Sequence, residues 1–335
     1  MNRLLNGDVG SGKTAVAALA LHAVSLSGHQ SALLAPTEVL ARQHFESLSR
    51  LFAHTHFQIA LYTKSYQLLD GEKVSKKTLL SALAAGIPSI VIGTHALLED
   101  KVSFRSLALV VVDEQHRFGV SQRAKLQEES FRSDDGRLES VPHFLAMTAT
   151  PIPRTLSLAC FGNLDISLLN EMPKNRKPII TKVARNHADR TKIEDFIRQE
   201  IKKGRQAFII FPLVETSLAL KDVKAAVAEH ETLEKKIFPD LRIGLIHGKM
   251  KSQEKEAMMK AFQERAFDIL VATSVVEVGI DIPNASVIVI EEADRFGLSQ
   301  LHQFRGRVGR GDHQSYCFLI PGEHASLENA RLEAL

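Results

Sequence analysis

The chain has 335 residues, of which 44% are hydrophobic and 24% charged, and its net charge is +3. This length allows two domains, and the composition excludes a disordered or fibrous protein. No apolar run approaches the roughly 20 residues of a membrane span, and no signal peptide is evident. The two cysteines, Cys160 and Cys317, lack metal-ligand spacing and favour a reducing compartment. We therefore expect a soluble, cytoplasmic protein.

The first motif lies almost at the start of the chain and has the spacing G-x-x-x-x-G-K-T of a phosphate-binding loop. Its residues are Gly7, Asp8, Val9, Gly10, Ser11, Gly12, Lys13 and Thr14. Glycines let successive backbone N–H groups surround a phosphate, Lys13 reaches the β- and γ-phosphates of ATP, and Thr14 holds Mg²⁺. Residues 15–26 are expected to form a helix whose N-terminus adds positive charge. The alternative, a glycine turn that caps a helix by accident, fits so complete a motif poorly.

Short apolar runs alternate with amphipathic stretches of helical length. The runs are residues 31–35, 89–92, 107–112 and 143–147, and then 206–211, 242–246, 268–272, 286–290 and 315–320. Because runs such as 109–112 do not alternate with polar residues, they predict parallel strands covered by helices on both faces. The pattern indicates an α/β fold with ligand sites at the carboxyl ends of the strands.

The two sets of runs resemble a duplication. Residues 77–94 give a helix, a turn, a strand and a threonine, and residues 255–273 repeat that order. Periodicity alone does not exclude the alternative that both sets are an ordinary alternation of strands and helices without a duplication. A segment rich in charge and turn formers separates the sets and is typical of a linker. We expect a first domain over 1–165, a linker over 166–182 and a second domain over 183–335.

A buried strand ends abruptly in two carboxylates, Asp113 and Glu114. Such a pair is costly unless a cation or strong donors meet it. In a phosphate-loop enzyme Asp113 holds Mg²⁺ and Glu114 takes the proton from the attacking water, while Gln115 and His116 are placed to sense the γ-phosphate. An isolated pair would be a solvated strand end, but its position after a phosphate loop favours catalysis. Most of the other histidines are expected at the surface or at helix ends.

Arginines alternate with glycines over residues 305–311. A guanidinium binds phosphate in two-pronged fashion, and one placed on a transferring γ-phosphate contributes about 10³–10⁵ in rate. The alternative is a basic loop that faces solvent. The phosphate loop in the other half favours the catalytic interpretation, with Arg307 and Arg310 as the candidates.

Together these segments resemble the ordered motifs of superfamily 2 helicases, and among them the RecG family of branch-migrating DNA helicases. The segments are GDVGSGKT, APTEVLARQH, GTHAL, DEQHRFGV, TATPIPRT, ATSVVEVGID and QLHQFRGRVGRG. The transcription-repair coupling translocases share several of them. Gln115 and residues 171–179 favour the RecG family over the translocases, which remain the alternative.

The resemblance implies two tandem RecA-like parallel-sheet lobes of the P-loop NTPase class, with ATP and Mg²⁺ in the cleft between them. It adds Gly279 and Asp281 to the nucleotide site. It also implies that Thr37, Thr94 and Thr273 contact DNA phosphates at helix N-termini. The implied activity is that of an ATP-dependent DNA helicase, which moves on branched or forked duplex DNA in recombination and stalled-fork repair.

The implied setting is the nucleoid, for a monomer that has single-stranded DNA-binding protein as a candidate partner and no membrane contact. The family's N-terminal wedge domain, its adenine-contacting segment and its C-terminal coupling hairpin have no counterpart in these residues. We therefore expect a motor core. A small-molecule kinase is disfavoured as an alternative, because it would leave the second half of the chain without a purpose. The remaining alternative is a truncated nucleotide-binding fragment without productive unwinding.

Overall fold

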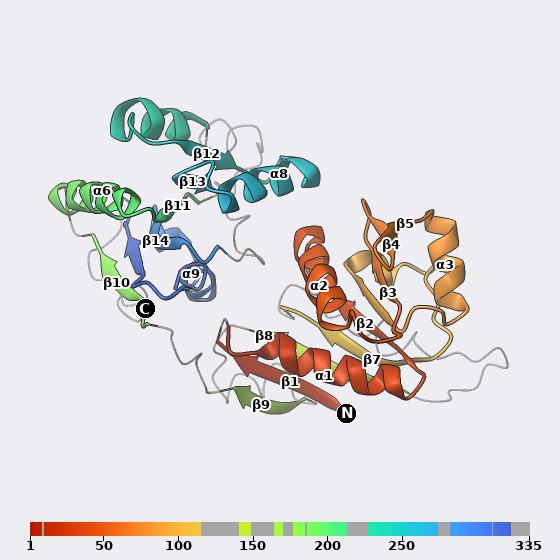
Figure 1. Cartoon of the computed structure of the whole chain (residues 1–335). Coiled ribbons are helices and arrows are strands. Elements are labelled where there is room, and N and C mark those ends of the chain that lie inside the picture. Colours follow the sequence, from red (N-terminus) through yellow and green to blue (C-terminus); the bar gives the residue numbers. More distant parts are fainter. Residues whose placement is uncertain are drawn as a thin grey trace. The chain divides into compact units, whose positions relative to one another are not determined.

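The chain forms two compact units, residues 1–172 and residues 173–335 (Figure 1). The computed structural model describes residues 1–8, 10–114, 141–148, 164–169, 177–184, 186–212, 227–273, 282–309 and 311–322. Each unit is built on one sheet of mostly parallel strands with helices packed against it. Among the described helices, none has the length and apolar character needed to cross a membrane.

The first unit contains a nine-stranded sheet in the order β5-β4-β3-β6-β2-β7-β8-β1-β9. Its strands are β1 (Asn2–Gly7), β2 (Gln30–Leu34), β3 (Ile59–Tyr62), β4 (Gln67–Leu69), β5 (Glu72–Lys73), β6 (Ile90–Gly93), β7 (Leu107–Val112), β8 (His143–Thr148) and β9 (Asp165–Leu169). Its helices are α1 (Lys13–Leu26), α2 (Glu38–Leu51), α3 (Lys76–Ala84) and the short 3₁₀ helix η1 (His95–Leu98). Strands β4 and β5 extend the sheet as antiparallel additions at one end.

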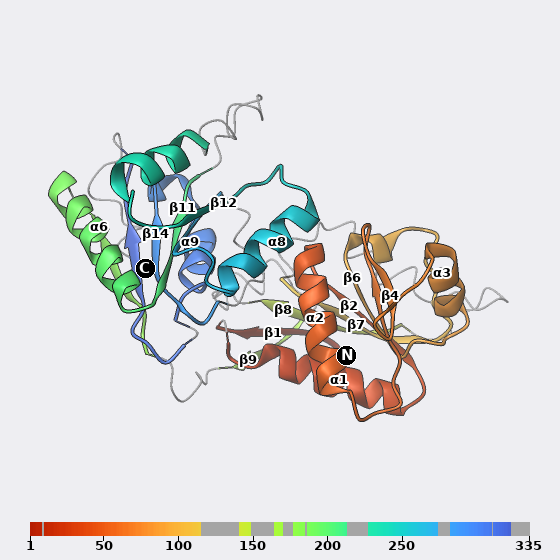
Figure 2. The same cartoon turned by 45° about the horizontal axis from the view of Figure 1, so that its top comes forward.

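Helices cover both faces of this sheet. Leu79 and Leu83 of α3 cluster with alternate strand residues such as Val91 and Val110. Helices α1 and α2 lie on the other face, which is turned toward the viewer in Figure 2. Because β2, β3 and β6 are buried along their whole length, both faces of these strands contribute to the core. This is the arrangement that unbroken apolar runs predict.

The second unit contains a six-stranded parallel sheet in the order β10-β15-β14-β11-β13-β12. Its strands are β10 (Ile180–Val183), β11 (Gln206–Ile210), β12 (Ile243–Ile246), β13 (Ile269–Ala272), β14 (Ala285–Ile290) and β15 (Tyr316–Leu319). Its helices are α6 (His187–Lys202), the π-helical turn η3 (Leu233–Ile237), α8 (Ser252–Gln263), the 3₁₀ turn η5 (Ala293–Arg295) and α9 (Leu298–Arg305). Ile193 and Ile197 of α6 pack on one face, whereas Phe262 of α8 and Phe304 of α9 pack on the other.

The strand order confirms the duplication predicted from the sequence. In chain order, the strands β1, β2, β3, β6, β7 and β8 of the first unit match β10 to β15 of the second. In space, the first set lies in the order β3-β6-β2-β7-β8-β1 and the second in the order β12-β13-β11-β14-β15-β10. Each strand of the second sheet therefore has a counterpart in the first.

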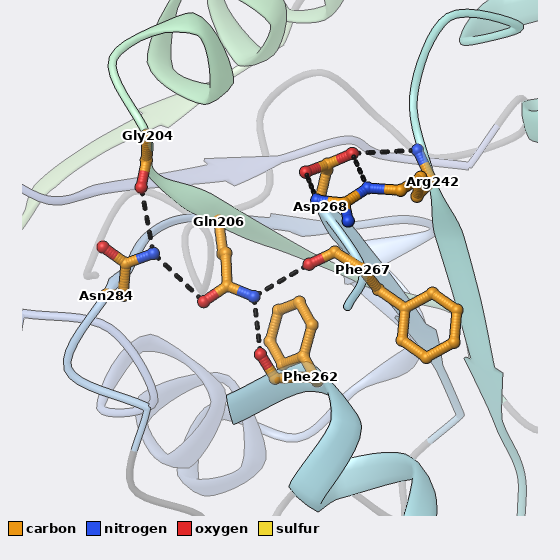
Figure 3. A network of polar contacts seen from close by, with 7 residues as sticks. All are labelled: Gly204, Gln206, Arg242, Phe262, Phe267, Asp268 and Asn284. Atoms are coloured by element: carbon orange, nitrogen blue, oxygen red, sulfur yellow. Dashed lines mark hydrogen bonds and ion pairs between the residues drawn. The ribbon is translucent and has the colours of Figure 1, made fainter. Parts of the chain in front are cut away.

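A buried glutamine at the start of the second strand of each set shows how closely the units agree. The side-chain amide nitrogen of Gln30 donates to one carbonyl at the end of a helix and to another in the following turn. That of Gln206 does the same in the second unit, as Figure 3 shows. The acceptors are Leu83 and Pro88 in the first unit (3.1 and 3.2 Å) and Phe262 and Phe267 in the second (2.7 and 2.8 Å). The same side-chain type therefore satisfies the same buried carbonyl groups twice.

The segment predicted as a linker, residues 166–182, carries strand structure at both ends. Most of β9 lies within it and pairs with β1, while β10 begins in it and pairs with β15. Both are edge strands that are only partly buried, so neither has the continuous apolar run that identifies a central strand. Residues 170–176, between them, lie outside the described residues.

Candidate nucleotide site

The turn between β1 and α1 has the tight geometry that its glycines predict. Strand β1 ends at Gly7, and α1 begins at Lys13. Gly10 and Gly12 have φ angles of +83° and +92°, in the left-handed region that glycine adopts without a steric cost. A Cβ atom on Gly7 would lie 2.5 Å from the Ser11 hydroxyl oxygen and 2.9 Å from the Leu169 Cβ, so a larger residue would have to displace both. The loop conformation thus follows from the residue types in the motif.

The N-terminus of α1 is suited to an anion. Gly12 at the N-cap supplies no side-chain hydrogen bond, and the first N–H groups of a helix have no partner within it. The Lys13 ammonium donates to the carbonyl oxygens of Gly7 and Asp8, both at 2.8 Å, and the Thr14 side chain is exposed beside it. These groups fit the phosphates of a nucleotide. Val9, the remaining residue of the motif, lies outside the described residues.

Asp113 and Glu114 follow β7 directly, as predicted. The backbone N–H of Glu114 donates to the Asp113 carboxylate at 3.0 Å, and Glu114 has a φ angle of +50°. The His44 Nε2–H donates to the other carboxylate oxygen of Asp113 at 2.8 Å. Gln115 and His116 lie outside the described residues.

His44 is an exception to the expectation that most histidines lie at the surface or at helix ends, because it is buried in α2 and only 7% exposed. A signal for it existed in the sequence. His44 belongs to the stripe Ala41, Phe45 and Leu48 that faces the core, and a polar side chain in such a stripe needs a partner. Asp113 supplies that partner.

Parallel strands bring the candidate residues of the first unit to one edge of its sheet. The phosphate loop follows β1, Thr37 follows β2, Thr94 follows β6 and Asp113 follows β7. Thr37 is the N-cap of α2, where its hydroxyl oxygen accepts from the Leu40 N–H at 3.3 Å. Thr94 is buried at the start of the 3₁₀ turn η1. The predicted ATP and DNA residues therefore share this edge.

In the second unit Thr273 takes the place that Thr94 has in the first. It follows β13, its backbone N–H donates to the carbonyl of Ile246 at 3.2 Å, and its hydroxyl is buried without a hydrogen-bond partner among the described residues. Arg307 follows α9, is 3% exposed, and donates through Nε to the carbonyl of Gln303 at 3.2 Å. Outside the described residues lie Gly279, Asp281 and Arg310.

Comparisons with known proteins agree with this architecture. A family model for the DEAD/DEAH box helicases matches residues 1–158, and one for the helicase conserved C-terminal domain matches residues 190–312. The chain is 50% identical to the ATP-dependent DNA helicase RecG of Synechocystis over 99% of its length, and 50% identical to RecG of Bacillus subtilis over 99%. It spans only 38% and 47% of those two relatives.

A solved structure of RecG bound to a three-way DNA junction matches all of this chain and 41% of its own, with a TM-score of 0.75 and 40% sequence identity. The two units thus correspond to two tandem RecA-like helicase domains. The chain therefore belongs to the superfamily 2 helicases, in which its sequence matches the RecG group.

Proposed function

We propose that the chain is the ATP-driven motor core of a RecG-type DNA helicase. The observation that carries this proposal is the edge of the first sheet, where the phosphate loop, the Lys13 ammonium and the Asp113–Glu114 pair come together. Such an edge supplies phosphate donors and a base for water. The 50% identity to RecG proteins supports DNA as the partner.

In this proposal each residue of the first unit has a separate task. The N–H groups at the start of α1 and the Lys13 ammonium bind the phosphates, and the Glu114 carboxylate accepts the proton of the attacking water. Thr14 and Asp113 hold Mg²⁺, which when bound neutralises charge on the phosphate oxygens. His44 keeps the Asp113 carboxylate in one orientation through its hydrogen bond of 2.8 Å.

The second unit supplies Arg307 and Arg310, whose guanidinium groups stabilise charge on the γ-phosphate. Gln115, His116, Gly279 and Asp281 complete the surroundings of the nucleotide. Hydrolysis then changes the grip of the two domains on DNA, through phosphate contacts made by three threonines. These are Thr37, Thr94 and Thr273. The RecG structure with a three-way junction supports branched duplex DNA, and so a place at the nucleoid, for this chain.

The test is steady-state ATP hydrolysis by the full chain, with and without Mg²⁺, measured with forked and with linear duplex DNA at one fixed salt concentration. We expect hydrolysis to need Mg²⁺ and to be stimulated more by the fork. Lys13→Ala should lower turnover at least about 10²-fold, as expected for removal of a phosphate donor. The matched control is Lys76→Ala, an exposed lysine of α3 in the same unit.

Three results would contradict this proposal. Equal stimulation by forked and linear DNA argues against a RecG-type motor. Turnover of Lys13→Ala equal to that of Lys76→Ala means that the β1–α1 loop is not the catalytic site. Binding of a non-hydrolysable ATP analogue by the parent without any turnover reduces the chain to a nucleotide-binding module.

A further inference from the structure

Strand β14 in the second unit ends in an acidic pair, Glu291 and Glu292, at the place where β7 ends in Asp113 and Glu114. The backbone agrees in detail. The N–H of Asp113 donates to the last residue of β2 at 2.9 Å, and the N–H of Glu291 donates to the last residue of β11 at 2.9 Å. The second residues of the two pairs, Glu114 and Glu292, both have positive φ angles, +50° and +45°. The second unit therefore keeps the acidic strand end of the first.

The helices that follow the first strand of each set, α1 and α6, end in the same way. Each is followed by a glycine in the left-handed region, Gly28 with φ +76° and Gly204 with φ +80°. Thr14 lies fourteen residues before Gly28, and Arg190 lies fourteen residues before Gly204. Both helices are continuous over this length. Arg190 therefore occupies the helical position that Thr14 has in the first unit.

These two positions are joined directly in the second unit. The Arg190 guanidinium donates to the Glu291 carboxylate at 2.8 Å, and Glu291 is only 7% exposed. In the first unit the corresponding residues, Thr14 and Asp113, are the two proposed to hold Mg²⁺. We infer that a guanidinium replaces the metal ion in the second unit, and that the Arg190–Glu291 ion pair is a positioning element for α9 and for Arg307, which follows it.

The start of α6 differs from a phosphate site in two further respects. Asn186 is its N-cap, and the side-chain oxygen accepts from the Asp189 N–H at 2.9 Å. Asp189 lies fifteen residues before Gly204, as Lys13 lies fifteen residues before Gly28. An N-cap that satisfies an N–H group, and a carboxylate in place of the ammonium, both disfavour phosphate. The second unit thus keeps the framework of a nucleotide site without its ligand.

The segment from residue 291 to residue 297 links the ion pair to α9. The Ala293 N–H donates to the carbonyl just after β15 at 2.9 Å. Phe296 packs edge-to-face on Phe304 of α9, with ring centroids 5.1 Å apart. Arg307 follows α9, is buried, and donates through Nε to the carbonyl of Gln303, the residue before Phe304. A displacement of the end of β14 would therefore also displace the start of α9.

Three more carboxylates face Glu291: Glu194 on α6, Glu229 on the neighbouring helical turn and Glu292 beside it. All three oppose a negative charge on Glu291. Burial raises the pKa of Glu291 to about 7, and Arg190 acts in the opposite direction. The guanidinium is thus the group that keeps this carboxylate ionised, as the pair requires.

The experiment uses the full chain at pH 8 and compares Glu291→Gln and Arg190→Gln with the parent. Amide hydrogen exchange over residues 291–305 should become at least about tenfold faster in both variants. The kcat for ATP should fall about 10- to 100-fold with KM within twofold, because misplacing a catalytic group costs about this much. Arg190→Lys, which keeps the cation, should restore most of both values.

The matched control is Asp268→Asn. Asp268 forms a two-pronged ion pair with Arg242 at 2.7 and 3.0 Å, at the opposite edge of the same sheet (Figure 3). This variant should lose stability but keep the exchange rates of residues 291–305 and the kcat. Titration with a non-hydrolysable ATP analogue should find one site per parent chain and none in Lys13→Ala.

The inference is overturned if the amide hydrogens of residues 291–305 exchange as slowly in Arg190→Gln and Glu291→Gln as they do in Asp268→Asn. It is also overturned if Lys13→Ala still binds the nucleotide analogue. The kcat part rests on the proposed function, whereas the exchange part does not. The parent chain could hydrolyse no ATP while amide exchange of residues 291–305 still becomes faster in Arg190→Gln and Glu291→Gln. That outcome would contradict the proposed function and support the ion pair as a positioning element.

Discussion

The two units have the same strand order, yet they begin their first helices in different ways. Helix α1 starts after Gly12, which has a φ angle of +92° and provides no side-chain cap, and its first residue is Lys13. Helix α6 starts after Asn186, which caps it with a hydrogen bond of 2.9 Å. A glycine turn leaves N–H groups available to a phosphate, whereas a polar cap satisfies one of them. The two units thus differ at this point in a few residues of one loop and not in the sheet.

The acidic strand ends differ in their partners in a similar way. The Asp113 carboxylate accepts from an imidazole of α2, whereas the Glu291 carboxylate accepts from a guanidinium of α6. An imidazole leaves carboxylate lone pairs available for other ligands, while a guanidinium brings a full positive charge to the place where a metal ion would add one. One backbone framework therefore holds an imidazole–carboxylate contact in one unit and a guanidinium–carboxylate ion pair in the other.

The largest effect is expected at Arg310, because the proposed function assigns this guanidinium to the γ-phosphate. Arg310→Ala should lower the rate of ATP hydrolysis about 10³- to 10⁵-fold while binding of a non-hydrolysable analogue changes little. Single-turnover hydrolysis and calorimetry measure the two quantities. The control is Arg295→Ala, which removes an exposed arginine that pairs with Glu292 at 2.6 Å. Equal rates for the two variants would contradict a catalytic role for the second unit.

The next largest effect distinguishes the roles of the two acidic pairs, Asp113–Glu114 and Glu291–Glu292, in ATP turnover. Glu114→Gln should lower turnover about 10²- to 10⁴-fold, because the general base is lost, and should leave ATP binding intact. Glu292→Gln, the same substitution at the corresponding position with φ +45°, should leave turnover within a factor of two of the parent. Steady-state assays with saturating ATP measure both. If Glu292→Gln is as slow as Glu114→Gln, the pairs do not have separate roles.

Most of the fold could be predicted from the sequence because the central strands are unbroken apolar runs. Each predicted run, for example residues 107–112 and residues 286–290, coincides with an observed strand to within two residues. Strands β4, β5, β9 and β10 were missed because they are short or lie at an edge, and exposed edge strands need no apolar run. Strand β3 was missed as well, although it is buried along its whole length, because it has only four residues. Pairing at an edge depends on neighbours that are distant in sequence.

The loop of the candidate site could be predicted because its chemistry is local, contained in eight consecutive residues. The contacts of His44 and of Arg190 could not, because each joins a helix to the end of a strand that is distant in sequence: His44 to Asp113, and Arg190 to Glu291. Only the strand order shows that such residues meet. For His44 the sequence shows only that a polar residue in a core-facing stripe needs a partner, whereas Arg190 lies near the start of α6, where a charged residue is most often solvated.

A pH-dependent difference tests the burial of Glu291. Its pKa is about 7 in the folded chain against an ordinary value of 4.5, with burial as the main cause. Protonation of Glu291 therefore stabilises the fold fully below pH 4.5, and this contribution is lost as the pH rises to 7, by roughly 3 kcal/mol in total. In Glu291→Gln this loss is absent, so the variant should gain about that much relative to the parent between pH 5 and pH 8.

Urea unfolding at four pH values across this range measures the difference between parent and variant. Glu264→Gln, at an exposed position after α8, is the control and should differ from the parent by a constant amount. A constant difference for Glu291→Gln as well would mean that Glu291 is ionised in the folded chain over the whole range, and would contradict its pKa of about 7.

The smallest effect tests the similarity of the two units. Gln30→Ala and Gln206→Ala each remove the amide that serves two carbonyl groups, and unsatisfied buried acceptors should cost about 2 kcal/mol in either unit. Thermal unfolding measures this cost, with Gln263→Ala at an exposed position of α8 as the control. A loss of stability in one unit alone would mean that the matching hydrogen bonds do not contribute equally to the stability of the two units. Equal costs, with kcat unchanged, would show that the units share their framework and differ only in the residues added at its edge.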